Sequence, residues 1–286
     1  MLRAMRNPRP VCPNSACVNH QAPPAGFYRK KGYRRPAHNR QPIPRYQCKA
    51  CGAYFCATQV KPFRQHHRPD LNQEVFRLAV SGVSMARMEI LLGCAKRTIA
   101  RKINHLAKQA QIHHAAFLAN EKNHTSHAMM DELETFIHAR WKQVSVPMVI
   151  RASTGQILAF DVCRKPTQMV RTNNAWAIDH RPQIVPRVLA AASVAFKPGA
   201  VLTTDGATSY PKWIRASGIA ATHRIKHTPV GNTDYDPLFA INLLFAKIRN
   251  DLARLSRRTW TTSKTMDALR NHLWLYVAWS NGYKLR

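Results

Sequence analysis

Apolar and polar positions follow three different patterns along this chain. Residues 1–66 show no helical period and are rich in Pro, Arg and Gly. In residues 70–110, apolar side chains recur every three or four positions, which is the period of a helix buried on one face. In residues 128–286, strand-like runs alternate with helical runs. The pattern predicts a small irregular arm, an all-α domain and an α/β domain.

The all-α domain, residues 70–110, has the pattern of three helices. The first begins at Asp70, a residue type that caps helices, and turn glycines end the first and second. The second helix covers 84–93 and the third covers 94–109. The apolar stripe of the third helix consists of Ile99, Ile103 and Leu106.

Residues 111–127 are polar and carry several histidines, and we interpret them as a linker. A histidine metal site is the alternative for this segment. Residues 128–286 then alternate strands with helices, which predicts a mixed α/β sheet. Predicted strands cover 128–137, 200–205 and 221–225, with a hairpin over 146–162. Predicted helices cover 182–195, 210–217, 236–255 and 264–281.

The charge of the chain points to a class of partner. There are 44 Lys and Arg against 14 Asp and Glu, a formal net charge of +30. Nucleic acid is the polyanion that fits best, because neutralising its phosphates releases condensed counterions. No apolar run of about 18 residues and no basic amphipathic anchor is present, so a membrane is not an expected partner. The N-terminus lacks the apolar segment of a signal peptide, and we expect a cytoplasmic protein.

Two cysteine pairs in the basic arm have the spacing of metal ligands. The pairs are C-x4-C at Cys12 and Cys17, and C-x2-C at Cys48 and Cys51. Two such turns complete a tetrahedral zinc site, and an arm with so few apolar residues needs a metal in order to fold. We therefore expect Zn²⁺ here. The alternative is that the cysteines are reduced and the arm is unfolded.

A helix, a short helix, a Gly turn and a basic helix form the sequence pattern of a helix-turn-helix domain. The third helix would then enter the major groove of double-stranded DNA. A plain three-helix bundle with a solvated basic face is the alternative. The residues expected to contact DNA from this helix are Lys96, Arg97, Thr98, Arg101 and Lys102.

Two scarce acids are placed where a divalent metal site can form. Asp131 lies on the first strand of the α/β domain, and Asp205 ends the strand after the first long helix. In a ribonuclease-H-like sheet those strands are neighbours, so the two carboxylates would meet and hold Mg²⁺ for phosphoryl transfer. Alternatively, Asp205 only forms a turn with Gly206. For Asp131 the alternatives are an edge-strand charge, or that Glu132 or Glu134 is the ligand.

Three stretches resemble bacterial insertion-sequence transposases of the InsA/InsB type and their close relatives. They are MMDELETFI (129–137), VLTTDGATSYP (201–211) and IRNDLARLSRRTWTTSK (248–264). The resemblance implies a zinc-binding segment and a helix-turn-helix before a ribonuclease-H-like catalytic domain. It also implies an Asp-Asp-Glu site for Mg²⁺ or Mn²⁺ that cuts element ends and joins the 3′-hydroxyl to target DNA. A nucleoid-associated homo-oligomer that holds two DNA ends is expected on the same basis.

The chain departs from that family at the third acid, where it has Asn242. Either Asn242 ligates the metal through its amide oxygen, which Mg²⁺ accepts, or the site is not functional. We interpret the nearby Asp236 as a helix cap. An active Asp131–Asp205–Asn242 site makes the chain a transposase. A decayed site makes it a zinc-dependent DNA-binding protein, and an RNA-processing nuclease is a weaker third hypothesis.

A basic run follows Asn242 and is expected to track the phosphates of a DNA end. A solvated helix face is the alternative for each residue. The run consists of Arg249, Arg254, Arg257, Arg258 and Lys264.

Overall fold

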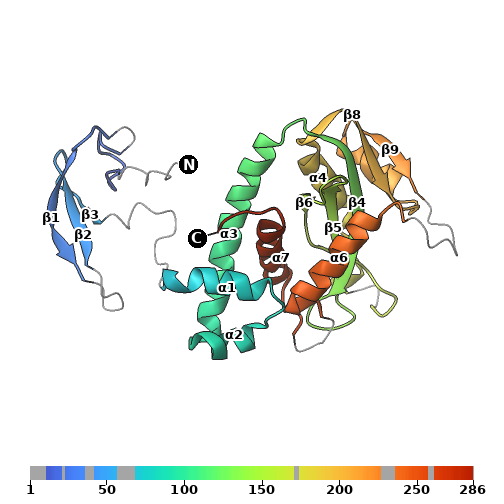
Figure 1. The fold of residues 1–286 in the computed structure, drawn as a ribbon, viewed down its shortest axis with the longest axis horizontal. Coiled ribbons are helices and arrows are strands. Elements are labelled where there is room, and N and C mark those ends of the chain that lie inside the picture. The colour runs from blue at the N-terminus through green and yellow to red at the C-terminus, as the bar shows by residue number, and fades with distance from the viewer. Residues whose placement is uncertain are drawn as a thin grey trace. The chain divides into compact units, whose positions relative to one another are not determined.

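A computed structural model shows the chain as two compact units, residues 1–67 and residues 68–286 (Figure 1). The first unit contains the cysteine pairs, and the second contains all of the predicted helices and the α/β sheet. The residues that the structure describes are 11–20, 23–35, 42–56, 68–170, 174–226, 236–256 and 261–285.

The first unit is built on an antiparallel sheet in the order β1-β2-β3. Its strands are β1 (Tyr28–Arg34), β2 (Ile43–Cys48) and β3 (Tyr54–Cys56). A small core of aromatic rings and cysteines supports the sheet, and Phe27 and Phe55 stack with centroids 5.8 Å apart. A core of this size buries little apolar surface, so the unit depends on another source of stability.

The second unit begins with a 3₁₀ turn, η2 (Pro69–Leu71), and three helices. They are α1 (Asn72–Ala79), α2 (Met85–Leu92) and α3 (Lys96–Asn120). Ser84 caps α2, and Gly93 ends it at φ 54°, a backbone conformation that glycine adopts at low cost. The prediction that Asp70 caps a helix is wrong. Its carboxylate instead accepts hydrogen bonds from the Arg68 guanidinium.

The predicted linker over 111–127 is wrong, because α3 continues without a break to Asn120. Ala107, Ala110 and His114 keep the apolar face of the helix in phase and are buried. The polar residues between them, which suggested a linker, lie on the opposite face and are exposed. The first strand of the sheet follows almost at once, from Thr125.

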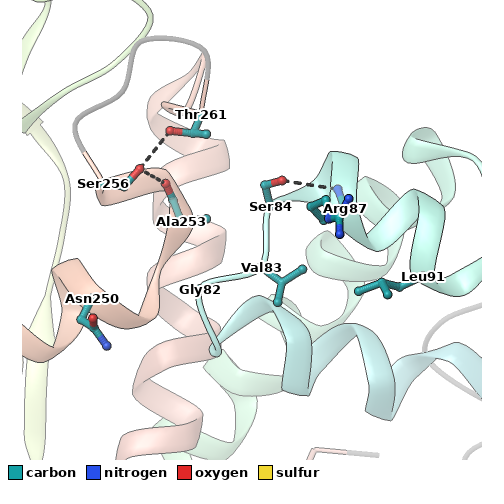
Figure 2. A pocket seen from close by; sticks show the side chains of 9 residues that line it. All are labelled: Gly82, Val83, Ser84, Arg87, Leu91, Asn250, Ala253, Ser256 and Thr261. Atoms are coloured by element: carbon teal, nitrogen blue, oxygen red, sulfur yellow. Dashed lines mark hydrogen bonds between the residues drawn. The ribbon is translucent and has the colours of Figure 1, made fainter.

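Helix α7 (Met266–Ser280) packs against both the helical segment and the sheet, so these two parts form one compact unit. Helix α3 packs along α7, and Leu275 is buried in the same cluster as Ile99. The turn before α2 also reaches the end of α6 (Phe239–Asp251), where the backbone N–H of Gly82 donates to the carbonyl of Asp251 at 2.6 Å. Figure 2 shows this junction from close by.

The sheet of the second unit is mixed, as predicted, with the strand order β6-β5-β4-β8-β9 and β7 beside β5. Strands β4, β8 and β9 are parallel, and β4, β5 and β6 are antiparallel. The strand bounds are β4 (Thr125–Phe136), β5 (Gln143–Arg151), β6 (Ile157–Phe160), β7 (Cys163–Arg164), β8 (Phe196–Thr204) and β9 (Thr222–Ile225).

Helices cover both faces of this sheet, because its strands are apolar on both sides. Helices α6 and α7 pack on one face and α4 (Arg181–Ser193) and α5 (Tyr210–Ser217) on the other. Short 3₁₀ turns, η3 (Ala175–Ala177) and η4 (Ala253–Leu255), connect these elements. Among the described helices, none has both the length and the apolarity that crossing a bilayer requires.

His114 connects α3 to the sheet and to the C-terminal segment. Its Nε2–H donates to the carbonyl of Leu158 at 2.8 Å, and its Nδ1 lies 3.0 Å from the hydroxyl of Tyr283. In the neutral ring Nδ1 accepts a hydrogen bond from that hydroxyl, so both ring nitrogens have partners. Burial lowers the pKa of His114, which means that the fold favours the neutral ring.

The folded state should therefore lose stability as the pH falls. The pKa of His114 is lower in the folded state than in the unfolded state, where it is about 6.5. The neutral ring therefore stabilises the fold above about pH 6.5, and this stability is lost as the pH falls toward the pKa of the folded state. We expect urea unfolding of the helical signal to shift to lower urea between pH 7 and pH 5, and His114→Gln to weaken that shift. The exposed neighbour gives the control, His113→Gln, and an equal effect of both variants would contradict the assignment.

Candidate functional site

The parallel pairing of β4 with β8 places Asp131 and Asp205 at matching positions of neighbouring strands. Met129 pairs with Thr203 in register, and each aspartate lies two residues further along its strand direction. Because side chains two residues apart share a face, both aspartates lie on the face that α6 covers. His127 Nε2 lies 2.8 Å from Thr203 Oγ1 and ties the two strands together just before the aspartates.

The pKa of Asp131 reflects both its burial and the acids near it. Burial, together with the charges of Asp205, Glu132 and Asp236, raises the pKa of Asp131 to about 6. One hydrogen bond, from the backbone N–H of Glu132 to Asp131 Oδ1 at 2.7 Å, opposes the increase. A half-buried carboxylate that faces other carboxylates is the environment that a divalent cation stabilises.

Asp205 also forms the turn that its sequence predicted. Its Oδ1 accepts a hydrogen bond from the backbone N–H of Ala207 at 3.0 Å. Among the described residues, Oδ2 has no hydrogen-bond partner. The turn and the metal hypothesis therefore do not compete, because the turn orients the carboxylate and leaves one oxygen available.

Asp236, which the sequence indicated only as a helix cap, also lies near enough for its charge to act on Asp131. The Oδ1 of Asp236 accepts from the backbone N–H of Leu238 at 2.8 Å, a cap-like contact before α6. Its Oδ2 accepts from Asn242 Nδ2 at 2.7 Å, and its charge contributes to the raised pKa of Asp131. Asn242 is exposed on the first turn of α6, and it joins the site through Asp236.

Glu132 and Glu134 point away from this group, so neither replaces Asp131. Ser145 Oγ donates to Glu132 Oε1 at 2.5 Å, and Arg181 lies 3.9 Å from its other oxygen. Glu134 is paired with Lys165. Both glutamates alternate with Asp131 along β4, so they lie on the opposite face, toward the start of α4.

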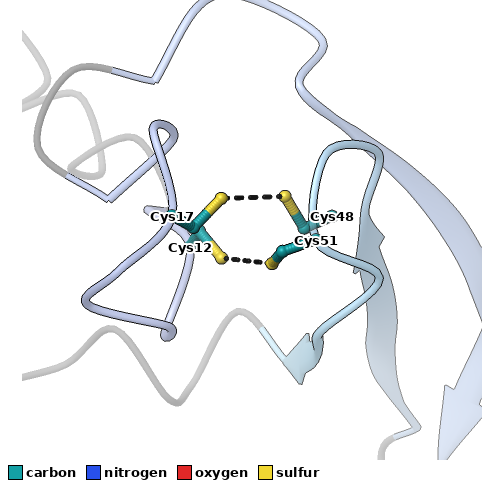
Figure 3. A group of neighbouring side chains, drawn as sticks. All are labelled: Cys12, Cys17, Cys48 and Cys51. Atoms are coloured by element: carbon teal, nitrogen blue, oxygen red, sulfur yellow. Dashed lines mark hydrogen bonds between the residues drawn. The ribbon is translucent and has the colours of Figure 1, made fainter.

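In the first unit, the four predicted cysteines form one cluster that can hold a metal ion (Figure 3). Their sulfur atoms all lie within 4.8 Å of one another. Cys12 and Cys51 are 3.4 Å apart and Cys17 and Cys48 are 3.8 Å apart. Sulfurs at the corners of a tetrahedron around zinc, each about 2.3 Å from the ion, are separated by about 3.8 Å. The cluster therefore fits a tetrahedral ion of this size.

The surroundings of the cysteines favour thiolates only in part. Burial opposes ionisation of Cys48, but hydrogen bonds from Asn19 and from the backbone amides of Cys51 and Ala50 outweigh it and lower the Cys48 pKa to about 6. Burial raises the pKa of Cys12 to about 12. A metal cation would supply the charge that the remaining thiolates need.

The basic residues of α3 divide into an exposed group and one buried member. Lys96, Arg97 and Arg101 are exposed, and Thr98 is half-buried. Lys102 is only 2% exposed, and burial lowers its pKa to about 8, with Asp70 partly offsetting the effect. The prediction that Lys102 contacts DNA is therefore wrong, because a period of 3.6 residues places it on the stripe beside Ile99.

The basic run after Asn242 is also uneven. Arg249 is half-buried and Lys264 is exposed, whereas Arg257 and Arg258 lie outside the described residues. Arg254 is mostly buried, and burial lowers its pKa to about 10. Arg254 therefore does not belong to a solvated face.

Comparisons with known proteins assign no family to the chain. No protein-family model matches the sequence, and no curated protein matches it. The function is therefore inferred from the residues and geometry of the chain itself.

Proposed function

We propose that this chain is a metal-dependent DNA transposase that cuts element ends and joins a 3′-hydroxyl to target DNA. The observation that carries the proposal is the in-register parallel pairing of β4 and β8, which brings Asp131 and Asp205 together. In a ribonuclease-H-like sheet, the first strand neighbours the strand that follows the first long helix, as β4 neighbours β8. The resemblance of three stretches to insertion-sequence transposases supports the same class.

Asp131, Asp205 and the Asp236–Asn242 pair would hold Mg²⁺ or Mn²⁺. When bound there, such ions would polarise the scissile phosphate and activate the attacking oxygen. Burial and the nearby acids raise the pKa of Asp131, and a bound cation would favour its ionised form. Asn242 orients Asp236 through its amide nitrogen, which leaves its amide oxygen to face a ligand.

The other parts of the chain would bind the DNA substrate. The four-cysteine cluster would hold Zn²⁺ and stabilise the basic arm. Helices α1 to α3 would act as a helix-turn-helix, with the exposed Lys96, Arg97 and Arg101 at the major groove. Holding two element ends at once would require a homo-oligomer, which the resemblance implies.

The direct test is strand cleavage and joining on the DNA that flanks the coding sequence of this chain. Duplexes from both flanks are incubated with the purified protein and Mg²⁺, Mn²⁺ or Ca²⁺. We expect nicks at the element ends and joined products with Mg²⁺ or Mn²⁺, but not with Ca²⁺. If no duplex from either flank is cut or joined, the enzyme proposal is wrong.

Asn242 distinguishes an active enzyme from the second candidate, a decayed copy that only binds DNA. That candidate is favoured by one observation, the amide at a position where the family resemblance implies a carboxylate. We expect Asn242→Ala to reduce cleavage by roughly 10- to 100-fold, because Asp236 loses its orienting partner. We expect Asn242→Asp to retain more activity than Asn242→Ala. A native protein that is inactive until Asn242→Glu is introduced would favour the decayed copy.

A further inference from the structure

A pocket lies where the turn before α2 meets the end of α6 and the residues that follow α6 (Figure 2). Its volume is about 610 Å³, which is large enough for a phosphate with its sugar. The polar residues that line it are Ser84, Arg87, Asn250, Ser256 and Thr261. No acidic side chain is among the lining residues, so the pocket offers hydrogen-bond donors without a negative charge.

One cation that lines the pocket, Arg87, and one that follows the lining residue Ala253 in sequence, Arg254, have no ion-pair partner among the described residues. Arg87 is exposed and forms no ion pair with any acid in the described ranges. Arg254 lies beside the pocket, where its Nη2 contacts Sδ of Met85 at 3.4 Å and its Nη1 donates to Ser263 Oγ at 3.0 Å. The Nε of Arg254 is buried and finds no acceptor among the residues described. A buried guanidinium without a carboxylate is a positive charge that an anion would compensate.

The start of α2 adds a second source of positive potential at the same place. The first backbone N–H groups of a helix lack partners within the helix, and the helix dipole is positive at that end. In α2, the Ser84 hydroxyl accepts from the N–H of Arg87 at 3.4 Å. The helix begins at Met85, which Arg254 contacts. The start of α2 and the two arginines favour an anion, and they oppose the negative end of the α6 dipole at Asn250.

We propose that this pocket binds a phosphate of the DNA backbone. The proposal deepens the proposed function, on which its choice of ligand rests. The short turn of residues 93–95 joins α2 to α3, so a phosphate at the start of α2 would belong to the duplex that α3 would read. The other wall of the pocket, at Asn250, lies eight residues or about 12 Å along α6 from Asn242. B-form DNA covers that separation in roughly four base-pair steps.

The consequence is that one DNA strand is held by both halves of the second unit. The α2 side of the pocket belongs to the helical segment, and the Asn250 side belongs to the helix that carries Asn242. A phosphate between them would fix the distance from the bases read by α3 to the phosphate at the acidic site. The pocket would then act as a positioning site that does not depend on base sequence.

The test measures DNA binding by the zinc-loaded, full-length protein without Mg²⁺, so that no cleavage occurs. Affinity for a labelled flanking duplex and for an unrelated duplex of equal length is followed by anisotropy over a range of salt. We expect Arg87→Ala to reduce the slope of log affinity against log salt by about one for both duplexes. Ser256→Ala should weaken binding by a smaller factor. Arg187→Ala, an exposed cation on α4 at the other face of the sheet, should change neither quantity.

Amide hydrogen exchange locates the contact and identifies the source of the phosphate. We expect exchange in residues 83–87 to slow when duplex DNA is added, and to remain unchanged with inorganic phosphate at the same phosphate concentration. Slowing by inorganic phosphate but not by duplex would overturn the proposal, as would equal salt slopes for Arg87→Ala and Arg187→Ala. A protein that binds as expected yet never cuts DNA would lose only the transposase proposal. A protein that cuts DNA while Arg87→Ala binds normally would lose only the pocket.

Discussion

Asp205→Asn is expected to reduce metal-dependent strand cleavage by on the order of 10³-fold or more. The substitution keeps the size of the side chain and its turn contact with Ala207, but it removes one of the charges that face Asp131. Losing a metal-binding charge costs several kcal/mol of transition-state stabilisation, and each 1.4 kcal/mol is about tenfold in rate. Cleavage of flanking duplexes under single-turnover conditions with Mg²⁺ measures this loss.

Glu134→Gln is the matched control for this variant. Glu134→Gln also replaces a carboxylate by an amide. Glu134 is on β4, but its side chain lies on the opposite face of the sheet, where it pairs with Lys165. We expect Glu134→Gln to cleave at close to the native rate. Both variants should bind DNA as the native protein does. Normal cleavage by Asp205→Asn would mean that Asp131 and Asp205 do not form the reactive site.

The sequence predicts the sheet well because each strand carries its own signal. Apolar residues on both faces of β5 and β8 indicate buried strands without any knowledge of their neighbours. The turn at Ser153-Thr154-Gly155 closes the hairpin of β5 and β6 as expected. The pairing of β4 with β8 is not visible in either strand alone, because it depends on the register that aligns Met129 with Thr203.

The end of α3 was not predictable in the same way. Polar and histidine residues after residue 110 suggested a linker, although buried positions continued at helical spacing as far as His114. His114 is buried because Leu158 and Tyr283 satisfy its two nitrogens, and both partners are distant in sequence. A single sequence shows that a histidine is present, but it does not show which distant residues the fold brings next to its ring.

Asp236 and Lys102 show the same limit at the candidate sites. A local pattern made Asp236 a helix cap, and it does make a cap-like contact with Leu238. Only the fold brings its charge near Asp131 and pairs it with Asn242. Lys102 was assigned to DNA by its charge, whereas packing of α3 buries it and Asp70 partly compensates that charge.

The basic arm should lose its fold when its metal is removed, while the second unit remains folded. The described core of the arm is a few aromatic rings around the cysteines, which is too small to offset the entropy of ordering the chain. Zinc binding to such a site contributes roughly 10–16 kcal/mol at neutral pH, which is then the folding energy of the arm. A zinc chelator, or Cys48→Ala, should therefore collapse the dispersion of the arm's amide signals in an NMR spectrum.

Cys56→Ala separates this effect from the loss of any buried thiol. Cys56 is buried in the same arm at 6% exposure but lies outside the four-sulfur cluster, so its replacement should leave zinc content and amide dispersion unchanged. Signals from the second unit should persist in every sample, because that unit has apolar cores of its own that contain no residue of the arm. An arm that keeps its dispersed amide signals after complete removal of zinc would show that its aromatic core folds without the metal. The four cysteines would then need another explanation, since nothing else in the described part of the arm requires their sulfurs to converge.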